Sequence, residues 1–305
     1  MKLSILVVSK TYNLLNALLK SLISATKIRK DSIEILVSWN GLDLDISLIN
    51  KNLFQNFYIT SLIPYHFASN MNELLDKASG EYLILVNDDV IFDINCIDKG
   101  IDLFNSNSEI GLIGSRLRDK NFNLSHAGIL FNLLHRPYHY LQGTIGFDHP
   151  ILSEINYPVP AVTGALMLTK KQFLKSLRFN TNYSICGEDI EFCLDLREKY
   201  NKDIFYCSDF SGIHQAETTR SRDPRQFNTS QDNLLISRRY FRFIFKSNIF
   251  NLKQESKFVQ STLRSYRKFN INNFIEGKNR KWDLTLFLFG YYLKILIIIR
   301  NVFRI

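Results

Sequence analysis

The chain has 305 residues, of which 46% are hydrophobic and 22% charged, so it can form one large domain or two modest ones around a buried core. This composition excludes a disordered, fibrous or disulfide-stapled protein. The net charge of +9 is unevenly distributed, because residues 236–305 carry +12 and the rest of the chain carries −3. A basic segment therefore extends from a mildly acidic body, and no motif in it supports binding to nucleic acid.

The cysteines and the N-terminus indicate a cytoplasmic protein. Cys96, Cys186, Cys193 and Cys207 show neither the paired spacing of a disulfide framework nor a C-x-x-C zinc pattern. Four histidines at positions 126, 135, 139 and 149 are too irregularly spaced to indicate zinc. The apolar run Leu3–Val8 is too short for a signal peptide or a membrane span.

Short apolar runs alternate with segments of helical periodicity, which is typical of βαβ units around a parallel sheet. In chain order we expect strands at 3–9, 33–39, 57–62, 82–86, 110–114, 161–169 and 204–207, with helices around 14–23, 68–78 and 187–200. Residues 119–160 read as irregular chain. The pattern predicts an α/β catalytic domain over residues 1–225, with a mostly parallel sheet flanked by helices, and a helical extension over 226–305.

Two acidic residues, Asp88 and Asp89, follow Asn87 directly after the apolar run 82–86. Open α/β sheets bind ligands beyond the carboxyl ends of their strands. Carboxylates there suit Mg²⁺ or Mn²⁺ holding a diphosphate, although Asn and Asp are also common in simple turns. The position predicts a metal and phosphate site, with a plain turn as the alternative.

A second acidic cluster, Glu188-Asp189, begins the helix expected after Gly187. Asp189 falls at the edge of the apolar helix face, where a carboxylate indicates a chemical role. The alternative is that acids in a first turn interact with the helix dipole, which stabilises the helix by about 0.3–1 kcal/mol. His214 follows a short strand and is either a ligand or a structural histidine. Gly164, between Thr163 and Ala165, either lets the backbone approach a sugar closely or permits tight packing.

Taken in order, these motifs resemble those of the family 2 glycosyltransferases with the GT-A fold, over about residues 3–225. The motifs that carry the resemblance are Ser4–Val8 with Thr11-Tyr12-Asn13, Glu34–Val37 with Asn40-Gly41, Ala68-Ser69-Asn70, Ala78–Tyr82, Asn87-Asp88-Asp89, Ser125–Gly128, Val162–Ala165, Glu188-Asp189 and His214. Each motif is common by itself, and the ordered set is specific.

The resemblance implies a role for each matching residue. It implies that Asp89 and His214 bind the divalent metal, Mn²⁺ or Mg²⁺, and that Asp189 is the catalytic base with Glu188 beside it. It also implies contacts to the nucleotide sugar, made by Thr11, Asn13, Asn70, Asn87, Asp88 and Gly164. Trp39 stands where the family often has an acidic residue that contacts the nucleotide base, and we expect either that its indole stacks on the base instead or that this loop differs from the family's.

The implied activity is an inverting, metal-dependent transfer of a sugar from a UDP- or dTDP-sugar to a saccharide or lipid-linked acceptor. The resemblance places it in the synthesis of bacterial surface glycan such as lipopolysaccharide, O-antigen or capsule. One alternative is a nucleotidyltransferase, which would need a glycine-rich phosphate loop that Ser9–Asn13 lacks. Another is a non-catalytic scaffold at the membrane periphery.

The C-terminal extension has the composition of a membrane-surface segment. Residues 238–246 interleave Arg and Lys with aromatic residues, and 284–299 form an apolar stretch of 16 residues, shorter than the ~20 that span a bilayer. Trp282, Tyr291 and Tyr292, with flanking Lys281, Arg300 and Arg304, suit attachment to an anionic surface. We expect the protein at the cytoplasmic face of the inner membrane, or else an extension that packs on the body or across a homodimer.

Overall fold

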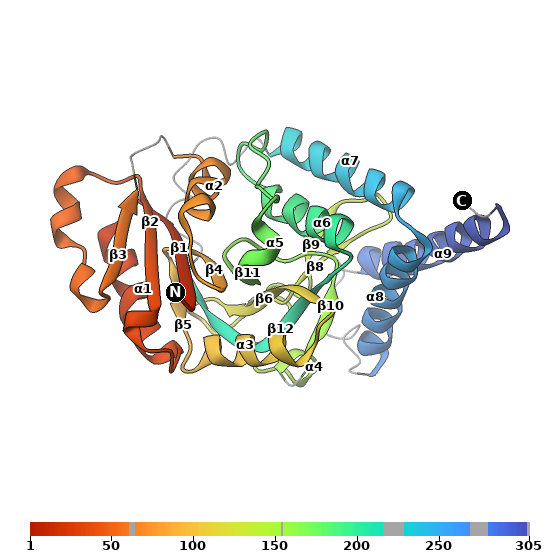
Figure 1. Cartoon of the computed structure of the whole chain (residues 1–305). Helices are drawn as coiled ribbons and strands as arrows, with labels where there is room; N and C mark the ends of the chain where they lie inside the picture. Colours follow the sequence, from red (N-terminus) through yellow and green to blue (C-terminus); the bar gives the residue numbers. More distant parts are fainter. Residues whose placement is uncertain (61–64, 154, 216–228, 269–279, 304–305) are drawn as a thin grey trace.

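The computed structural model describes residues 1–60, 65–153, 155–215, 229–268 and 280–303 (Figure 1). The domain boundary expected at residue 225 lies outside these residues, as do Arg304 and the side chains of Lys281 and Trp282. The described chain forms a central sheet with helices on both faces and three longer helices at its C-terminal end.

The central sheet has the strand order β10-β12-β6-β11-β4-β1-β2-β3. Its strands are β1 (Leu3–Ser9), β2 (Ile33–Trp39), β3 (Asn56–Thr60), β4 (Tyr82–Asn87), β6 (Ile110–Arg118), β10 (Tyr157–Val159), β11 (Leu166–Lys170) and β12 (Asp203–His214). The β3-β2-β1-β4 half is parallel, whereas β11 runs antiparallel to both of its neighbours. Two short strands extend the sheet, β5 (Val90–Phe92) beside β12 and β7 (Leu124–His126) beside β6, and β8 (Ile129–Phe131) pairs with β9 (Pro137–His139) separately.

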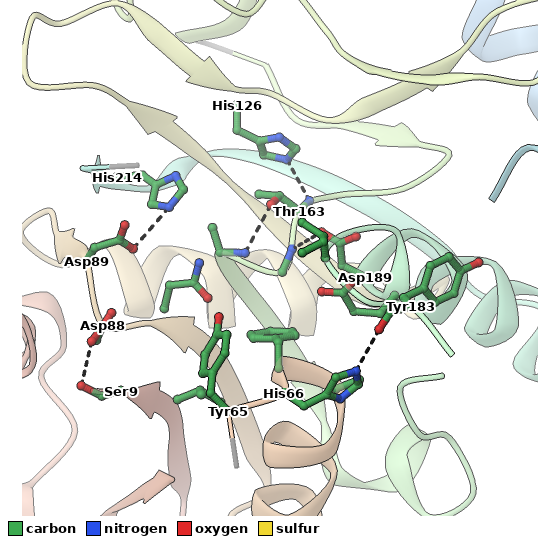
Figure 2. A pocket seen from close by; sticks show the side chains of 18 of the residues that line it. Ser9, Tyr65, His66, Asp88, Asp89, His126, Thr163, Tyr183, Asp189 and His214 are labelled. Carbon is green, nitrogen blue, oxygen red and sulfur yellow. Dashed lines mark hydrogen bonds and ion pairs between the residues drawn. The ribbon is translucent and has the colours of Figure 1, made fainter. Parts of the chain in front are cut away.

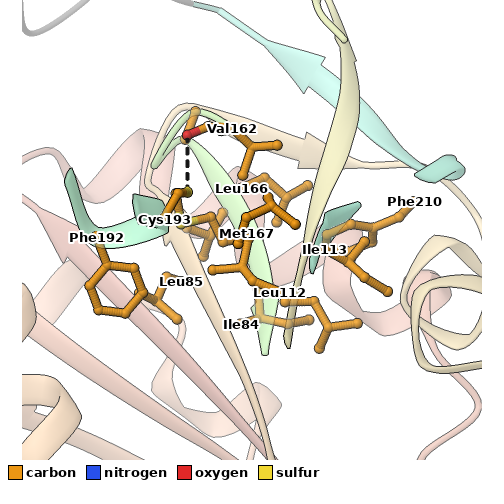
Figure 3. Close-up of a cluster of buried hydrophobic side chains, with 14 of the residues drawn as sticks. Ile84, Leu85, Leu112, Ile113, Val162, Leu166, Met167, Phe192, Cys193 and Phe210 are labelled. Carbon is orange, nitrogen blue, oxygen red and sulfur yellow. Dashed lines mark hydrogen bonds between the residues drawn. The ribbon is translucent and has the colours of Figure 1, made fainter. Parts of the chain in front are cut away.

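Helices cover both faces of the sheet, so its strands are apolar on both sides. Helices α1 (Tyr12–Ala25) and α3 (Cys96–Ser106) lie on one face, and α2 (Phe67–Lys77) and α6 (Glu188–Tyr200) lie on the other (Figure 1). Every residue of β1, β2 and β6 is buried. Figure 3 shows side chains of β4, β6 and β11 packed together with Phe192 and Cys193 of α6, which fixes α6 to the centre of the sheet.

The strands expected at 3–9, 33–39, 82–86 and 110–114 and the three expected helices are confirmed. The strand expected at 57–62 is β3 as far as Thr60, and residues 61–62 lie outside the described residues. Strand β5 and helix α3 were not expected, and residues 119–160, expected to be irregular, contain β7 to β10 and the short helix α4 (Pro150–Ser153). The strand expected at 161–169 begins only at Leu166, after a turn at 164–165. The strand expected at 204–207 continues to His214, beyond a bulge between Tyr206 and Ser211 that shifts its register against β6.

A buried carboxylate ties the amino ends of β1, β2 and β4 together. Glu34 of β2 accepts hydrogen bonds from the Ser4 hydroxyl, from the backbone and hydroxyl of Ser79, and from the Gly80 N–H. Burial opposes ionisation of Glu34, but these hydrogen bonds outweigh it and hold the pKa of Glu34 below its usual value.

Replacing Glu34 by glutamine is expected to lower the free energy of unfolding by about 1–3 kcal/mol at neutral pH, because an amide group would then face hydrogen-bond donors. Since the folded-state pKa is lowered, the parent loses this stabilisation as the pH falls below about 5, and the variant does not. Urea unfolding across this range measures both effects. The exposed Asp43→Asn is the control, and equal stability of Glu34→Gln and the parent would contradict the prediction.

The C-terminal extension packs against the body through its first two helices. Helix α7 (Ser230–Lys246) lies beside α6 (Figure 1), and Arg239 forms ion pairs at 2.7 Å with Asp195 and Glu198 of α6. The Tyr240 ring stacks on Phe131 with ring centroids 3.4 Å apart. Helix α8 (Ile249–Lys268) supplies Glu255, which pairs with the buried Arg197 of α6 at 2.5 Å. Arg239, one of the basic residues of the extension, therefore pairs with acidic residues of the body.

Helix α9 (Arg280–Phe303) has a packed face and an exposed apolar face. Leu286, Phe289 and Leu293 are buried, and the helix contacts α8. Within the part of the chain that the structure describes, α9 alone contains a stretch long and apolar enough to cross a membrane, Leu284–Phe303, with a mean hydropathy of 1.7. This stretch continues past residue 299 to Phe303, so it is longer than the 16 residues, 284–299, that were counted from the sequence. Only 22% of that stretch is buried.

Candidate active site

A cavity of about 250 Å³ opens beyond the carboxyl ends of β1 and β4. It is enclosed by the start of α2, the turn before β11, the segment that precedes α6 and the end of β12 (Figure 2). Its lining includes Ser9, Lys10, Tyr65, His66, Asn87, Asp88, Asp89, His126, His139, Thr163, Gly164, Tyr183, Glu188, Asp189 and His214. The two acidic clusters, which are about 100 residues apart in sequence, and the late histidine thus share one cavity.

Strand pairing brings Asp89 and His214 together. Strand β5 begins at Val90, directly after Asp89, and His214 at the end of β12 is the register partner of Val90. The Asp89 Oδ1 and His214 Nε2 atoms are 3.3 Å apart (Figure 2). The Asp89 Oδ1 atom is buried and has no hydrogen-bond partner among the described residues. A carboxylate oxygen left without a donor beside an imidazole nitrogen is chemically suited to a divalent cation.

Asp89 and His214 alone do not complete the coordination of a metal ion. No group of three or more His, Cys, Asp and Glu side chains is arranged around a common point in the described part of the chain. Mg²⁺ and Mn²⁺ sites that hold a diphosphate typically have one or two protein carboxylates, and the phosphate oxygens complete the coordination. Asp89 and His214 therefore fit a metal that arrives with a phosphorylated ligand.

The Asp88 side chain is held in place by the end of β1. Its Oδ2 atom accepts a 2.7 Å hydrogen bond from the Ser9 hydroxyl (Figure 2). Burial raises the pKa of Asp88 to about 6, with a contribution from Asp89, and the hydrogen bonds from Ser9 and the Lys10 backbone act in the opposite direction. The Asp88 carboxylate is thus oriented by the first strand, in reach of a ligand beside Asp89.

Asp189 lies on the opposite side of the cavity at the N-terminus of α6. Its Oδ2 atom accepts a 2.8 Å hydrogen bond from the Gly164 N–H, and its Oδ1 atom accepts one of 2.8 Å from the Ile190 N–H. A Cβ atom on Gly164 would come within 3.3 Å of the Asp189 Cβ, so a larger residue there would crowd the carboxylate. The buried Glu188 lines the cavity beside it. The turn before β11 therefore fixes Asp189 toward the cavity.

The start of α6 requires glycine. Gly187 has φ +108°, and a Cβ atom there would come within 2.8 Å of the Tyr183 ring. This left-handed conformation ends the irregular segment before α6 and turns the first helical residues, Glu188 and Asp189, into the cavity.

Trp39 does not lie where the sequence interpretation placed it. Its side chain is fully buried beneath Gly41, and its indole N–H donates to the Leu42 carbonyl at 3.1 Å. No face of the indole lines the cavity, so stacking on a donor base is wrong for this conformation. A large aromatic residue at the end of a buried strand fills the core, and the sequence pattern alone did not distinguish this role from ligand contact.

Asn70, Thr11 and Asn13 also lie off the cavity lining. Asn70 is buried, and it accepts from the His66 N–H at 2.7 Å and donates to the Ser38 hydroxyl at 2.9 Å. It therefore supports the start of α2 and does not reach a ligand directly. Thr11 precedes α1 and Asn13 is exposed in its first turn, whereas Asn87, Asp88 and Gly164 do line the cavity.

Several lining residues were not identified from the sequence. Lys10 is the only Lys or Arg in the cavity lining among the described residues, and its ammonium lies 5.6 Å from the Tyr65 ring centroid. Its place directly after the first strand was the available signal. His66 and Tyr183 lie on the opposite wall and carry no motif of their own.

His126 supports the turn before β11. Its Nε2 atom accepts hydrogen bonds from the N–H groups of Gly128 (3.2 Å) and Thr163 (3.3 Å), so its proton is on Nδ1, 3.0 Å from Nδ1 of His139. Burial, and then His139 and His214, place the pKa of His126 well below its usual value, so the ring is neutral. His135 lies apart from His126 and His139, among Phe241, Phe289 and Tyr292.

Comparison with known proteins identifies one family. The Glycosyl transferase family 2 model matches residues 6–177. A search of curated proteins found no match.

Solved structures share the fold at low sequence identity. The structure of S. aureus TarS 1–349 is 15% identical with a TM-score of 0.50, and the match covers 95% of this chain and 89% of that one. The mannosyltransferase PcManGT from Pyrobaculum calidifontis, in complex with GDP-Man and Mn²⁺, is 13% identical with a TM-score of 0.53 and coverages of 99% and 87%. GalNAc-T7 with UDP, GalNAc and Mn²⁺ is 14% identical with a TM-score of 0.54 and coverages of 70% and 44%.

Proposed function

The chain belongs to glycosyl transferase family 2 and is a glycosyltransferase of the GT-A fold, and from this premise we propose that it is an inverting, metal-dependent enzyme that uses a UDP- or dTDP-sugar. The observation that carries the proposal is the placement of Asp89 with His214 and of Asp189 on opposite sides of one cavity. Two similar structures contain Mn²⁺ together with a nucleotide or nucleotide sugar, which supports the same ligands here.

The donor half of the cavity is formed by Asp88, Asp89, Lys10 and His214. Asp89 and His214 would hold the metal, which when bound neutralises charge on the departing diphosphate. Lys10 would supply a cation near the same phosphates, and Asp88, fixed by Ser9, would accept hydrogen bonds from the ribose. A cavity on a body of net charge −3 thereby binds an anionic donor.

Asp189 is the proposed general base. Its carboxylate accepts the proton of the acceptor hydroxyl as that oxygen attacks the anomeric carbon from the face opposite the leaving diphosphate. The two N–H groups that bond Asp189 hold its carboxylate in position. Glu188 lies next to it on the acceptor side of the cavity.

Replacing Asp89 by asparagine is expected to weaken Mn²⁺-dependent binding of the donor nucleotide by about tenfold or more, because the metal loses a charged ligand. Calorimetric titration of UDP and dTDP with Mn²⁺, and with EDTA in its place, measures this. The exposed Asp102→Asn on α3 is the matched control. Binding of the nucleotide by Asp89→Asn as tight as by the parent in Mn²⁺ would contradict the ligand assignment.

We propose a saccharide or lipid-linked acceptor in bacterial surface glycan synthesis, with residues 1–225 as the catalytic domain and 226–305 as an extension that attaches to membrane. The test is a panel of UDP-, dTDP- and GDP-sugars with Mn²⁺, each incubated with water alone, with methyl glycosides, and with polyprenyl-phosphate-linked sugars. Release of nucleoside diphosphate identifies the donor, and formation of a glycoside of opposite anomeric configuration establishes inversion. No nucleotide binding and no turnover with any donor would favour the non-catalytic scaffold.

The membrane proposal rests on a surface to which three elements contribute. The exposed side of α9 presents Leu284, Phe287, Leu288, Tyr291, Ile295, Ile298, Ile299, Val302 and Phe303. Phe241 and Phe245 of α7 are also exposed, and His135 contacts both Phe241 and the α9 residue Tyr292. These apolar side chains and the +12 charge of the extension fit the cytoplasmic face of the inner membrane, where anionic lipids attract basic residues.

Replacing Ile298 by aspartate is expected to weaken binding to phosphatidylglycerol vesicles by about tenfold or more, because an exposed apolar side chain is lost from the surface and a negative charge added. Vesicle flotation measures it, with the exposed Asn301→Asp as the control for charge alone. Unchanged flotation of Ile298→Asp, together with conversion of a dimer to a monomer in size-exclusion chromatography, would instead assign this surface to a homodimer.

A further inference from the structure

The segment Tyr183–Cys186 forms the wall of the cavity next to Asp189. Tyr183, Ser184 and Ile185 line the cavity, and the segment has no regular secondary structure of its own. This wall lies across the cavity from Asp89 and His214 (Figure 2). In the proposed function, an acceptor whose hydroxyl reaches Asp189 lies next to it.

A carboxylate from the C-terminal extension fixes this wall. Asp232, in the first turn of α7, accepts from the Ser184 N–H at 3.1 Å through Oδ1, and from the N–H groups of Ile185 (2.8 Å) and Cys186 (3.2 Å) through Oδ2. Asp232 is only 3% exposed. Three consecutive N–H groups converging on one buried carboxylate leave the segment little freedom to move.

The catalytic body holds the same segment from the other side. The His66 Nε2 atom lies 2.8 Å from the Tyr183 carbonyl oxygen, and the Tyr183 hydroxyl donates to Glu191 of α6 at 2.5 Å. These contacts anchor Tyr183, whereas the amides of the next three residues are anchored by Asp232. The extension thus adds three hydrogen bonds to this segment beside those from α2 and α6.

We propose that Asp232 is a positioning residue for the transfer reaction, which sets the acceptor wall at residues 184–186, so that the C-terminal extension completes the acceptor site. This inference rests on the proposed function, in which Asp189 receives the acceptor proton. Asp232 touches neither substrate nor reacting atoms in this role. Its effect falls on the acceptor and spares the donor, because the wall it holds lies away from Asp89 and His214.

The test compares Asp232→Asn and Asp232→Ala with Gln231→Ala, an exposed change in the same helical turn. The donor and the methyl glycoside that turn over in the panel are used, and hydrolysis of the same donor with water alone is measured in parallel. A misplaced wall is expected to lower kcat/KM for the glycoside about 10- to 100-fold, while hydrolysis and UDP–Mn²⁺ binding change less than about threefold. Asp232→Asn preserves the shape of the side chain, and it is the variant measured if Asp232→Ala does not fold.

Equal loss of transfer and hydrolysis, or unchanged transfer in both variants, would overturn the inference. Hydrogen–deuterium exchange of the 184–186 amides is the second readout, and it is independent of the proposed function. Faster exchange confined to that segment in Asp232→Asn, and absent in Gln231→Ala, is expected. If no donor turns over, the proposed function fails, and hydrogen–deuterium exchange then tests only whether Asp232 anchors residues 184–186. Unchanged exchange of these amides in Asp232→Asn would overturn that anchoring.

Discussion

Replacing Asp189 by asparagine is expected to lower sugar transfer by about 10²- to 10⁴-fold while donor binding changes little, because the amide cannot accept the proton of the acceptor hydroxyl. The asparagine oxygen can still accept from the Gly164 N–H, whereas the amide nitrogen cannot replace the oxygen that accepts from the Ile190 N–H. Transfer is measured at saturating donor with the acceptor from the panel, and nucleotide affinity by calorimetry with Mn²⁺.

The control for Asp189 is Glu198→Gln, which removes an acid from the same helix at a site paired with Arg239. It is expected to keep transfer close to the parent rate. Equal turnover by Asp189→Asn and the parent would exclude Asp189 as the base. Loss of transfer together with an equal loss of nucleotide affinity would show instead that the substitution disturbed the cavity.

The second large effect is on stability, at the junction of α6 with the extension. Arg197 and Glu255 are both nearly inaccessible, their charged groups lie 2.5 Å apart, and the Tyr240 hydroxyl donates to Glu255 at 2.7 Å. Glu255→Gln is expected to lower the free energy of unfolding by about 3 kcal/mol, because it leaves a buried guanidinium without its partner. The value falls at the low end of the usual range because Arg197 also acts on the nearby Asp203.

Urea unfolding measures this loss, with the exposed Lys257→Gln on the same helix as the control, expected within about 0.5 kcal/mol of the parent. The double variant Arg197→Met with Glu255→Gln is expected to be less destabilised than the sum of the single variants, because neither charge is then left alone. Additive losses would contradict the buried ion pair.

The location of the acidic residues could be predicted in part because it depends on local sequence. The apolar run before Asn87 ends at the sheet edge, so Asp88 and Asp89 were expected in a metal and phosphate site or else in a plain turn. Gly187 followed by acids marks a helix start, but local sequence left Asp189 open between a chemical role and the helix dipole. Asp189 and His214 were expected in the same site as Asp89 only through the family resemblance. The position of His214 depends on the β5–β12 register, a long-range pairing that no local pattern encodes.

The residues that were missed or misplaced depend on tertiary packing. Whether Trp39 faces a ligand or the core is decided by Gly41 and Leu42 folding over it, and alternation along a fully buried strand carries no such information. Asp232 was overlooked because its importance comes from three amide groups about 46–48 residues away. The same holds for His66 and Tyr183, which meet only when α2 and the start of α6 cover one face of the sheet.

Helix α7 extends from the proposed acceptor wall to the exposed apolar surface that we propose to contact lipid. Asp232 is near its start and the exposed Phe245 near its end, 13 residues apart, which corresponds to about 20 Å of helix. A protein resting on lipid through Phe245 and α9 would hold its cavity at a set height above the headgroups. Acceptors would then be selected by how far their terminal sugar stands from the bilayer, in addition to what that sugar is.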